Sequence, residues 1–213
     1  NAFTEKTNLV ESVRQPGGNI TGVRFPGPDN VVKRFEILHE LVPQAKRVLV
    51  PYDPNYPSAP SALDGLRLSA SSLGITLVEN PANNVEALRA DLQARSASGD
   101  IGIDAVLLMP DLICHSPDGF GTILKFANEN KVPVGGGAGF TADLGALFSF
   151  VPDFFEEGKL AALLADKILK GTEAGTIPVI TPQSSLRINY KATQALGLKV
   201  PEGLLTRAEE IIR

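Results

Sequence analysis

The length, composition and charge of the chain are those of an ordinary globular protein and exclude several classes of partner. Its 213 residues are 43% hydrophobic and 21% charged, which allows one large domain or two small lobes. The net charge of −4 and the lack of a basic run argue against nucleic-acid binding. No apolar stretch reaches the roughly 18–20 residues of a membrane span, and a single cysteine, Cys114, excludes an internal disulfide.

Short apolar runs alternate with helical periods between about residues 20 and 140, a pattern typical of βαβ units. The expected strands are 20–25, 47–50, 75–78, 105–109, 132–134 and 145–150. The expected helices are 30–41, 58–73, 85–95, 119–130 and 152–170, with two short helices after them. Gly74 is expected to end the second helix, and Asn83 or Asn84 to cap the third. The pattern predicts an α/β fold, a doubly wound parallel sheet of about five strands.

The loops that follow the strands carry the candidate binding residues, because ligands of open α/β sheets bind outside the carboxyl ends of the strands. The loop after strand 47–50 contains Tyr52, Asp53, Asn55, Tyr56 and Ser58. It offers aromatic faces, a carboxylate, an amide and a hydroxyl to a ligand. The alternative is a turn whose polar groups bond their own backbone.

Asp111 follows the buried strand 105–109 and is the next candidate. Its carboxylate could accept a hydrogen bond from a ligand ammonium, or it could cap the following helix, where Asp118 offers another cap. Cys114 and His115 lie in the same loop, but residues adjacent in sequence rarely adopt the thiolate–imidazole geometry of a nucleophile. We therefore expect Asp111 to line the site and no catalysis by Cys114.

A glycine-rich loop, 135–139, follows strand 132–134 and contains the candidates Gly136 and Gly137. Glycine permits a ligand to approach the backbone closely. The loop lacks a following Gly-Lys-Ser/Thr and is not G-x-G-x-x-G, so a phosphate cradle is not expected. We interpret its amides as donors to a ligand carboxylate and Phe140 as a stacking wall; the alternative is a flexible connection.

Two segments at opposite ends of the chain resemble the solute-binding proteins of ABC importers. Residues 14–23, Arg-Gln-Pro-Gly-Gly-Asn-Ile-Thr-Gly-Val, are similar to the R-P-G-G-N-[IV]-T-G-V signature of that family. Residues 186–201 and 204–212 are similar to its characteristic ending and terminal helix. The resemblance spans nearly the whole chain and implies a periplasmic-binding-protein-like fold, in the subfamily that contains tryptophan/tyrosine-type binders.

The same resemblance implies how the chain is divided. Residues 1–19 would be a remnant of the first lobe and crossover, 20–150 the α/β ligand-binding lobe, and 151–213 a crossover, helix and C-terminal segment of the first lobe. Most of the first lobe and the signal peptide are expected to lie outside this chain. The remaining first-lobe segments would then expose apolar surface or bury it in a dimer.

The family also places polar and aromatic residues at corresponding sites. It carries a loop similar to the one that contains Asp53, Asn55 and Ser58, which implies ligand contacts there. It has an aromatic residue and then a polar residue at the positions of Phe150 and Asp153, at the mouth of its cleft. Asp153 is expected to cap the helix that follows whether or not it touches ligand.

The implied function is that of a non-enzymatic, extracytoplasmic solute-binding protein. Two lobes would close on a small organic solute, for example an aromatic amino acid or a related acid. The partner would be a membrane ABC permease, with the protein in the periplasm or lipid-anchored outside the cell, and no cofactor or metal is expected. The alternative is a ligand-sensing domain of a membrane receptor. An enzyme is disfavoured because the sequence has no G-x-S-x-G motif and too few His and Cys for a metal site.

Overall fold

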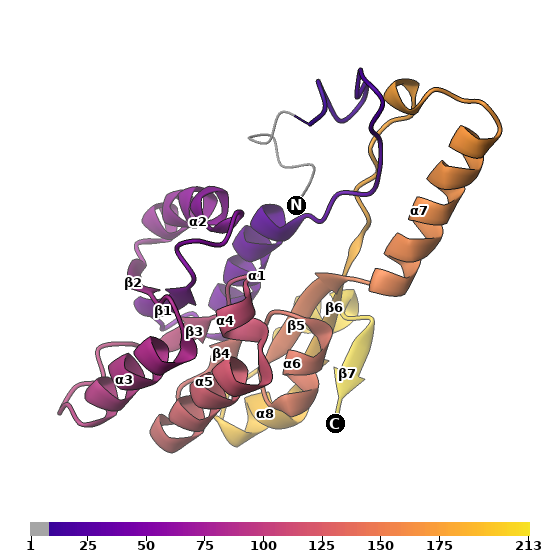
Figure 1. The fold of residues 1–213 in the computed structure, drawn as a ribbon. Coiled ribbons are helices and arrows are strands. Elements are labelled where there is room, and N and C mark those ends of the chain that lie inside the picture. The colour runs from indigo at the N-terminus through magenta and orange to yellow at the C-terminus, as the bar shows by residue number, and fades with distance from the viewer. Residues whose placement is uncertain (1–8) are drawn as a thin grey trace. The chain divides into compact units, whose positions relative to one another are not determined.

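The computed structural model describes residues 9–213, which form two compact units (Figure 1). The larger unit consists of Gly27–Val151 and Ser185–Arg213. The smaller unit runs up to Pro26 and includes Pro152–Ser184. The chain therefore passes from one unit to the other three times along its length.

The larger unit has the expected alternation of strands and helices. Its strands are β1 (Arg47–Tyr52), β2 (Thr76–Pro81), β3 (Ala105–Leu107), β4 (Val134–Gly135), β5 (Phe148–Pro152), β6 (Ser184–Asn189) and β7 (Glu210–Ile212). Its helices are α1 (Gly27–Leu41), α2 (Ala59–Leu73), α3 (Val85–Ser96), α4 (Leu112–His115), α5 (Pro117–Asn130), α6 (Gly139–Leu144), α8 (Tyr190–Ala195) and α9 (Glu202–Arg207).

A four-stranded parallel sheet in the order β2-β1-β3-β4 forms the centre of the larger unit. Helices α1 and α2 pack together over one face, and α3 and α5 over the other (Figure 1). The residues predicted to be buried in this sheet are all buried: Val48, Leu49, Val106, Leu107, Leu108 and Val134. A strand covered on both faces must be apolar throughout, which explains the continuous apolar runs in the sequence.

Two predicted helix caps in this unit are confirmed, whereas α1 and α5 begin earlier than predicted, at Gly27 and Pro117. Gly74 ends α2 in the left-handed conformation, with φ of 64°, which glycine adopts without a Cβ penalty. Asn84 begins α3, and its side chain accepts a hydrogen bond from the Ala87 amide at 2.8 Å. The caps fix where each loop leaves its helix and so where the strand-end loops lie.

The last residues of the chain differ from the expected division. All of 151–213 was expected to belong with the first lobe, but Ser185–Arg213 lies in the larger unit. The reason is that β6 joins β5 and β7 in a second sheet, in the order β5-β6-β7, and the side chains of Leu186 and Ile188 enter the main core. The fifth strand expected in the main sheet, β5, therefore pairs with β6 instead.

The smaller unit contains α7 (Phe154–Leu169), the short 3₁₀ helix η1 (Ala174–Thr176) and extended segments. The strand predicted over 20–25 is wrong: only Val23 forms an isolated bridge, with Ile180. Its partner segment has prolines at 178 and 182, which have no amide hydrogen to extend the pairing.

Helix α7 leaves most of its apolar side chains in solvent. Only Leu164 is buried along its length. The exposed large side chains are Phe154, Phe155, Leu163, Ile168 and Leu169. Single exposed apolar residues are normal on protein surfaces, but α7 carries several of them on one helix. The expectation that segments after residue 151 expose apolar surface is therefore met by this helix.

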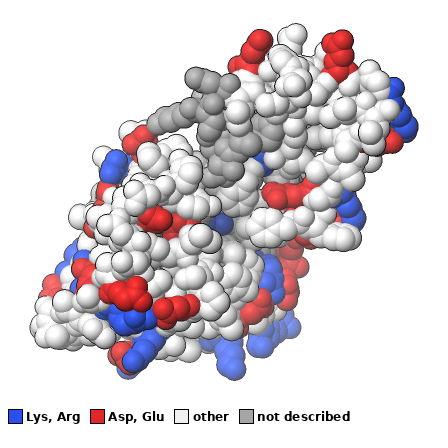
Figure 2. Space-filling view, viewed as in Figure 1, with Lys and Arg blue, Asp and Glu red and all other residues white. Residues whose placement is uncertain are grey.

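Charged side chains on the larger unit are mixed in sign. On the face drawn in Figure 2, acidic and basic groups alternate without a large patch of either. Several of them are paired, including Arg67 with Glu79 at 2.7 Å and Arg207 with Glu40 at 2.7 Å. This mixture agrees with the sequence argument against a nucleic-acid partner.

Candidate functional site

The carboxyl ends of β1, β3 and β4 lead into the loops that the sequence singled out. Because these strands are parallel neighbours, their exits lie along one edge of the sheet. Polar contacts between the loops confirm that the structure brings them together. Asp111 and His115, described next, make these contacts.

Asp111 connects the first two loops. Its carboxylate accepts hydrogen bonds from the Cys114 amide at 3.0 Å and from the Asp53 amide at 3.1 Å. The first contact makes it the cap of α4, which was the alternative to lining the site. The side chain is only 3% exposed, and burial raises the pKa of the carboxyl. Ser116, not Asp118, caps α5.

The loop after β1 is a self-bonded turn at Asp53. The Asp53 carboxylate accepts from the Asn55 amide at 2.8 Å, and the Asn55 side chain reaches Asn83 at 3.4 Å. Tyr56 is partly exposed, whereas Ser58 is fully buried and its hydroxyl has no hydrogen-bond partner. The alternative interpretation, a turn that satisfies its own backbone, therefore describes Asp53.

Tyr52 is the last residue of β1 and is directed toward the neighbouring strand. Its hydroxyl interacts with Glu79, whose carboxylate is paired with Arg67 at 2.7 Å. Burial is the main cause that raises the pKa of the Tyr52 hydroxyl, and the negative charge of Glu79 adds to it. Tyr52 therefore has a partner within the larger unit in addition to any ligand.

His115 joins the loop after β3 to the glycine-rich loop. Its Nδ1 lies 2.9 Å from the Asp111 carbonyl oxygen, and its Nε2 accepts a hydrogen bond from the Ala138 amide at 3.0 Å. An imidazole with this pair of partners is neutral, with the proton on Nδ1. Burial, and then the positive charge of Arg34, lower the pKa of His115 to about 4.

Cys114 does not have the environment of a nucleophile. The thiol is fully buried and donates to the Pro51 carbonyl at 3.2 Å. Burial raises the pKa of the thiol well above its usual value, so the reactive thiolate is suppressed. This agrees with the sequence argument against a Cys–His pair.

Gly136 and Gly137 are required by packing within the loop. A Cβ at Gly136 would overlap the Phe148 carbonyl, and a Cβ at Gly137 would overlap the His115 ring. The Gly137 amide donates to the Thr141 hydroxyl at 3.2 Å. The structure thus assigns the Gly137 amide an internal partner, which differs from the interpretation that it meets a ligand carboxylate.

Aromatic residues line the same edge of the larger unit. Phe140 is 41% exposed, and its ring lies edge-on to His115 at 6.4 Å and to Phe120 at 5.9 Å. Phe150, the central residue of β5, is partly exposed, and its carbonyl accepts a hydrogen bond from Arg34. Asp153 belongs to the smaller unit, where it caps α7 as predicted by accepting from the Phe155 amide at 2.7 Å.

Arg34 and His115 make contacts near the candidate site that the sequence interpretation missed. Arg34 lies in the middle of α1, on the face that also carries Ile37 and Leu41. The sequence did contain a signal: Arg34 lies three and four residues before Ile37 and Leu38, a spacing that places all three on the buried face of a helix. For His115 the signal was weaker, because a histidine in a loop has no periodic context.

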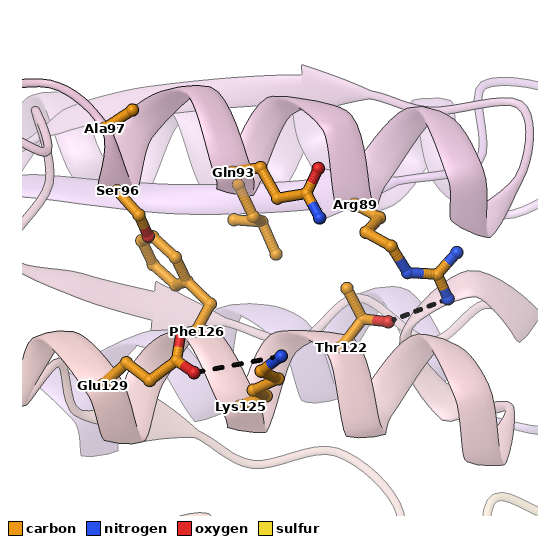
Figure 3. A pocket seen from close by; sticks show the side chains of 9 residues that line it. Arg89, Gln93, Ser96, Ala97, Thr122, Lys125, Phe126 and Glu129 are labelled. Carbon is orange, nitrogen blue, oxygen red and sulfur yellow. Dashed lines mark hydrogen bonds and ion pairs between the residues drawn. The ribbon is translucent and has the colours of Figure 1, made fainter.

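A separate cavity of about 330 Å³ lies between α3 and α5 (Figure 3). Its lining includes Arg89, Gln93, Ser96, Phe126 and Glu129. The lining runs from Arg89 and Thr122, in the second turns of the two helices, to Ala97 and Glu129 at their ends, and it includes none of the candidate residues of the strand-end loops. Arg89 is held by Asp118 at 2.8 Å, so its charge is already balanced.

Other classes of site find no support in residues 9–213. No group of three or more His, Cys, Asp or Glu side chains comes together there as a metal site would need. No helix in the described chain is long and apolar enough to cross a membrane. The polar groups at the strand ends are therefore the candidate site.

The sequence of the chain is similar to those of proteins of known family. The family model described as "ABC transporter substrate binding protein" matches residues 4–212. The chain belongs to this family. Its α/β fold with a parallel sheet is that of periplasmic binding proteins, as the sequence predicted.

Individual members of the substrate-binding family are moderately similar to the chain. A tyrosine-binding protein of Clostridioides difficile is 28% identical over 197 residues, which are 91% of this chain and 54% of that protein. A domain from Streptococcus pneumoniae solved in complex with L-Trp is 25% identical, with a TM-score of 0.79, over 97% of this chain and 68% of the other. A conserved domain protein from Vibrio cholerae is 30% identical, with a TM-score of 0.81, over 96% and 67% of the two chains.

The relatives are longer than this chain. The chain spans about half the length of the curated relative that it matches. Family membership and fold apply to the chain itself, whereas the activity, substrates and partners of the whole protein are matters of proposal.

Proposed function

We propose that the chain is part of the solute-binding component of an ABC importer and acts without catalysis. The observation that carries the proposal is the family match over residues 4–212. The position of the polar loops at the carboxyl edge of the sheet supports it, because solutes of this class of fold bind there. The permease partner and an extracytoplasmic location follow from the same family membership.

The larger unit is proposed to be one lobe of the binding protein and the smaller unit a part of the other. Ser185–Arg213 is included in the first of these lobes, in line with its packing. The exposed apolar face of α7 supports the idea that the smaller unit needs a further covering segment. A dimer made through this face, and a lipid anchor in the complete protein, are further parts of the proposal.

The proposed solute is an aromatic amino acid or a related acid. Relatives described as binding tyrosine and in complex with L-Trp support this class, as do the aromatic side chains near the strand ends. The candidate contacts are those proposed from the sequence, apart from the Gly137 amide. Phe140 is the exposed aromatic residue among them, and Tyr52, Tyr56 and Phe150 are partly exposed. The receptor alternative gains no support from the relatives.

Calorimetry on the complete natural polypeptide tests this function. L-tyrosine and L-tryptophan are expected to bind, and D-allose and short peptides are not. If a sugar binds and neither amino acid does, the ligand class is wrong although a binding role stands. Consumption of a bound probe, followed by mass spectrometry, would contradict the non-enzymatic proposal.

A further inference from the structure

Arg34 is a charged side chain in the interior of the larger unit. It is 1% exposed and lies in the middle of α1. Its Nε donates a hydrogen bond to the Phe150 carbonyl at 2.8 Å. Burial lowers the pKa of the guanidinium to about 10, so the group still carries a positive charge near neutral pH.

This charge has no opposite charge beside it in the described chain. The Nη1 atom of Arg34 is buried without a hydrogen-bond partner, and no carboxylate of residues 9–213 forms an ion pair with the group. Other arginines of the larger unit, although more exposed, do have carboxylate partners: Arg47, Arg67, Arg89, Arg95, Arg187 and Arg207. A buried, unpaired guanidinium is unfavourable, and a bound anion would remove that penalty.

Arg34 lies close to the strand-end loops. Its bonded carbonyl, at Phe150, lies in the middle of β5, and the preceding residue, Ser149, has a fully buried hydroxyl without a partner. Arg34 is also near enough to His115 for its charge to act on that ring, and His115 holds the glycine-rich loop. The group therefore lies close to the loops that follow β3 and β4, within the larger unit.

Two of the loop amides that might have met an anion already have internal partners. The Gly137 amide donates to Thr141, and the Ala138 amide donates to His115. The Asp111 carboxylate accepts hydrogen bonds from the Asp53 and Cys114 amides and, as an acceptor, has no hydrogen to donate to an anion. Among these groups, Arg34 Nη1 and the Ser149 hydroxyl remain as donors without an acceptor.

We propose that Arg34, assisted by the Ser149 hydroxyl, binds the carboxylate of the solute. This proposal rests on the function proposed above and identifies the part of the ligand that is recognised. Nη1 is shielded in the structure, so contact requires a shift of the segment at Phe150. That segment directly precedes the division between the two units after Val151, where movement accompanies closure in hinged proteins.

The test compares ligands with and without a carboxylate by calorimetry, on the complete natural polypeptide. L-tyrosine is compared with tyramine, and L-tryptophan with tryptamine. The unsubstituted protein is expected to bind each amino acid at least tenfold more tightly than its amine. Arg34→Gln should remove this preference by weakening amino-acid binding at least tenfold while leaving amine binding unchanged, and Arg89→Gln, a matched loss of charge, should keep it.

Several outcomes would overturn the proposal. If L-tyrosine and tyramine bind equally, or if Arg34→Gln keeps the preference, the carboxylate does not meet Arg34, and the solute-binding function stands. If sodium acetate alone stabilises the protein as strongly as the amino acids do, the site takes a free anion instead. If no amino acid or amine binds, the proposed ligand class fails separately.

A stability measurement gives a readout that does not depend on the ligand. Because the unpaired charge is unfavourable, Arg34→Gln should leave the melting temperature unchanged or raise it relative to Arg89→Gln. A lower melting temperature with unchanged affinities would assign Arg34 a purely structural role at Phe150 and overturn the proposal.

Discussion

The imidazole of His115 accepts a hydrogen bond from the backbone amide of Ala138, 3.0 Å away. Since Nδ1 of the same ring lies beside the Asp111 carbonyl, one side chain ties the loop after β3 to the loop after β4. Protonation of Nε2 would destroy its ability to accept this bond. The geometry of the proposed site therefore depends on His115 remaining neutral.

The first prediction concerns pH. The pKa of His115 is lowered from 6.5 to about 4 in the folded protein, so between these values the unfolded chain binds a proton that the folded protein does not. Stability should be complete above pH 6.5 and decrease as the pH falls toward 4, by up to about 3 kcal/mol from this group. Urea unfolding across this range measures it, and His115→Gln should flatten the curve. An equal slope in the variant would contradict the prediction.

The second prediction compares two glycines. Gly137→Ala places a Cβ against the His115 ring, whereas Gly121, in α5, has open space around it. Gly137→Ala should lower the free energy of unfolding by about 1–3 kcal/mol through overpacking. Gly121→Ala should raise it by about 0.5–1 kcal/mol, because alanine favours an exposed helix. Urea unfolding measures both, and equal effects would mean that the loop can move away from His115.

The third prediction concerns Asp111. Removal of its carboxylate in Asp111→Ala leaves the amides of Asp53 and Cys114 without acceptors. The free energy of unfolding should fall by about 2–4 kcal/mol, and Asp111→Asn, which keeps one oxygen acceptor, should lose less. Calorimetry on the folded Asp111→Asn variant then tests the ligand contact proposed from the sequence. Unchanged affinity there would restrict Asp111 to its structural role.

The fourth prediction concerns the apolar face of α7 in the 213-residue chain. Phe155 and Leu169 are 71% and 87% exposed, so their replacement should hardly change folding stability. We expect the chain to self-associate through this face, and the double change Phe155→Ser with Leu169→Ser should weaken that association in sedimentation equilibrium. Leu68→Ser, at a 76% exposed leucine of α2, is the control. Equal behaviour of the two variants would exclude α7 as the contact.

Much of the fold was predictable because the strands of the main sheet and the helices around it are specified by residues close to one another in the sequence. Apolar runs and caps are determined by nearby residues. The run 105–109 contains β3, which begins at Ala105 as predicted but ends at Leu107, and Asn84 caps α3 as predicted. The strand predicted over 20–25 was wrong because pairing depends on a distant segment, whose prolines do not appear in the pattern of the strand itself.

The site was less predictable than the fold. The loops proposed from the sequence lie at one edge of the sheet, but the sequence could not say whether Asp111 or the Gly137 amide had internal partners. The Asp111 contact with the Asp53 amide joins two different loops, and the Gly137 contact depends on how its loop turns toward Thr141. Arg34 was missed because it lies in a helix, away from the loops that were searched. Its spacing from Ile37 and Leu41 indicates a position facing the core, but its contact with the Phe150 carbonyl joins distant segments of the chain.

The three passages of the chain between its units have a consequence for how the protein can be cut. A gene truncated after Val151 would encode the main sheet but lose Leu186 and Ile188, which complete its core. Residues 152–184 behave instead as an insertion within the larger unit, so a short flexible bridge in their place should preserve that unit. The larger unit is therefore obtained by itself when residues 152–184 are removed and the C-terminal segment is kept, and not when the chain is cut after Val151.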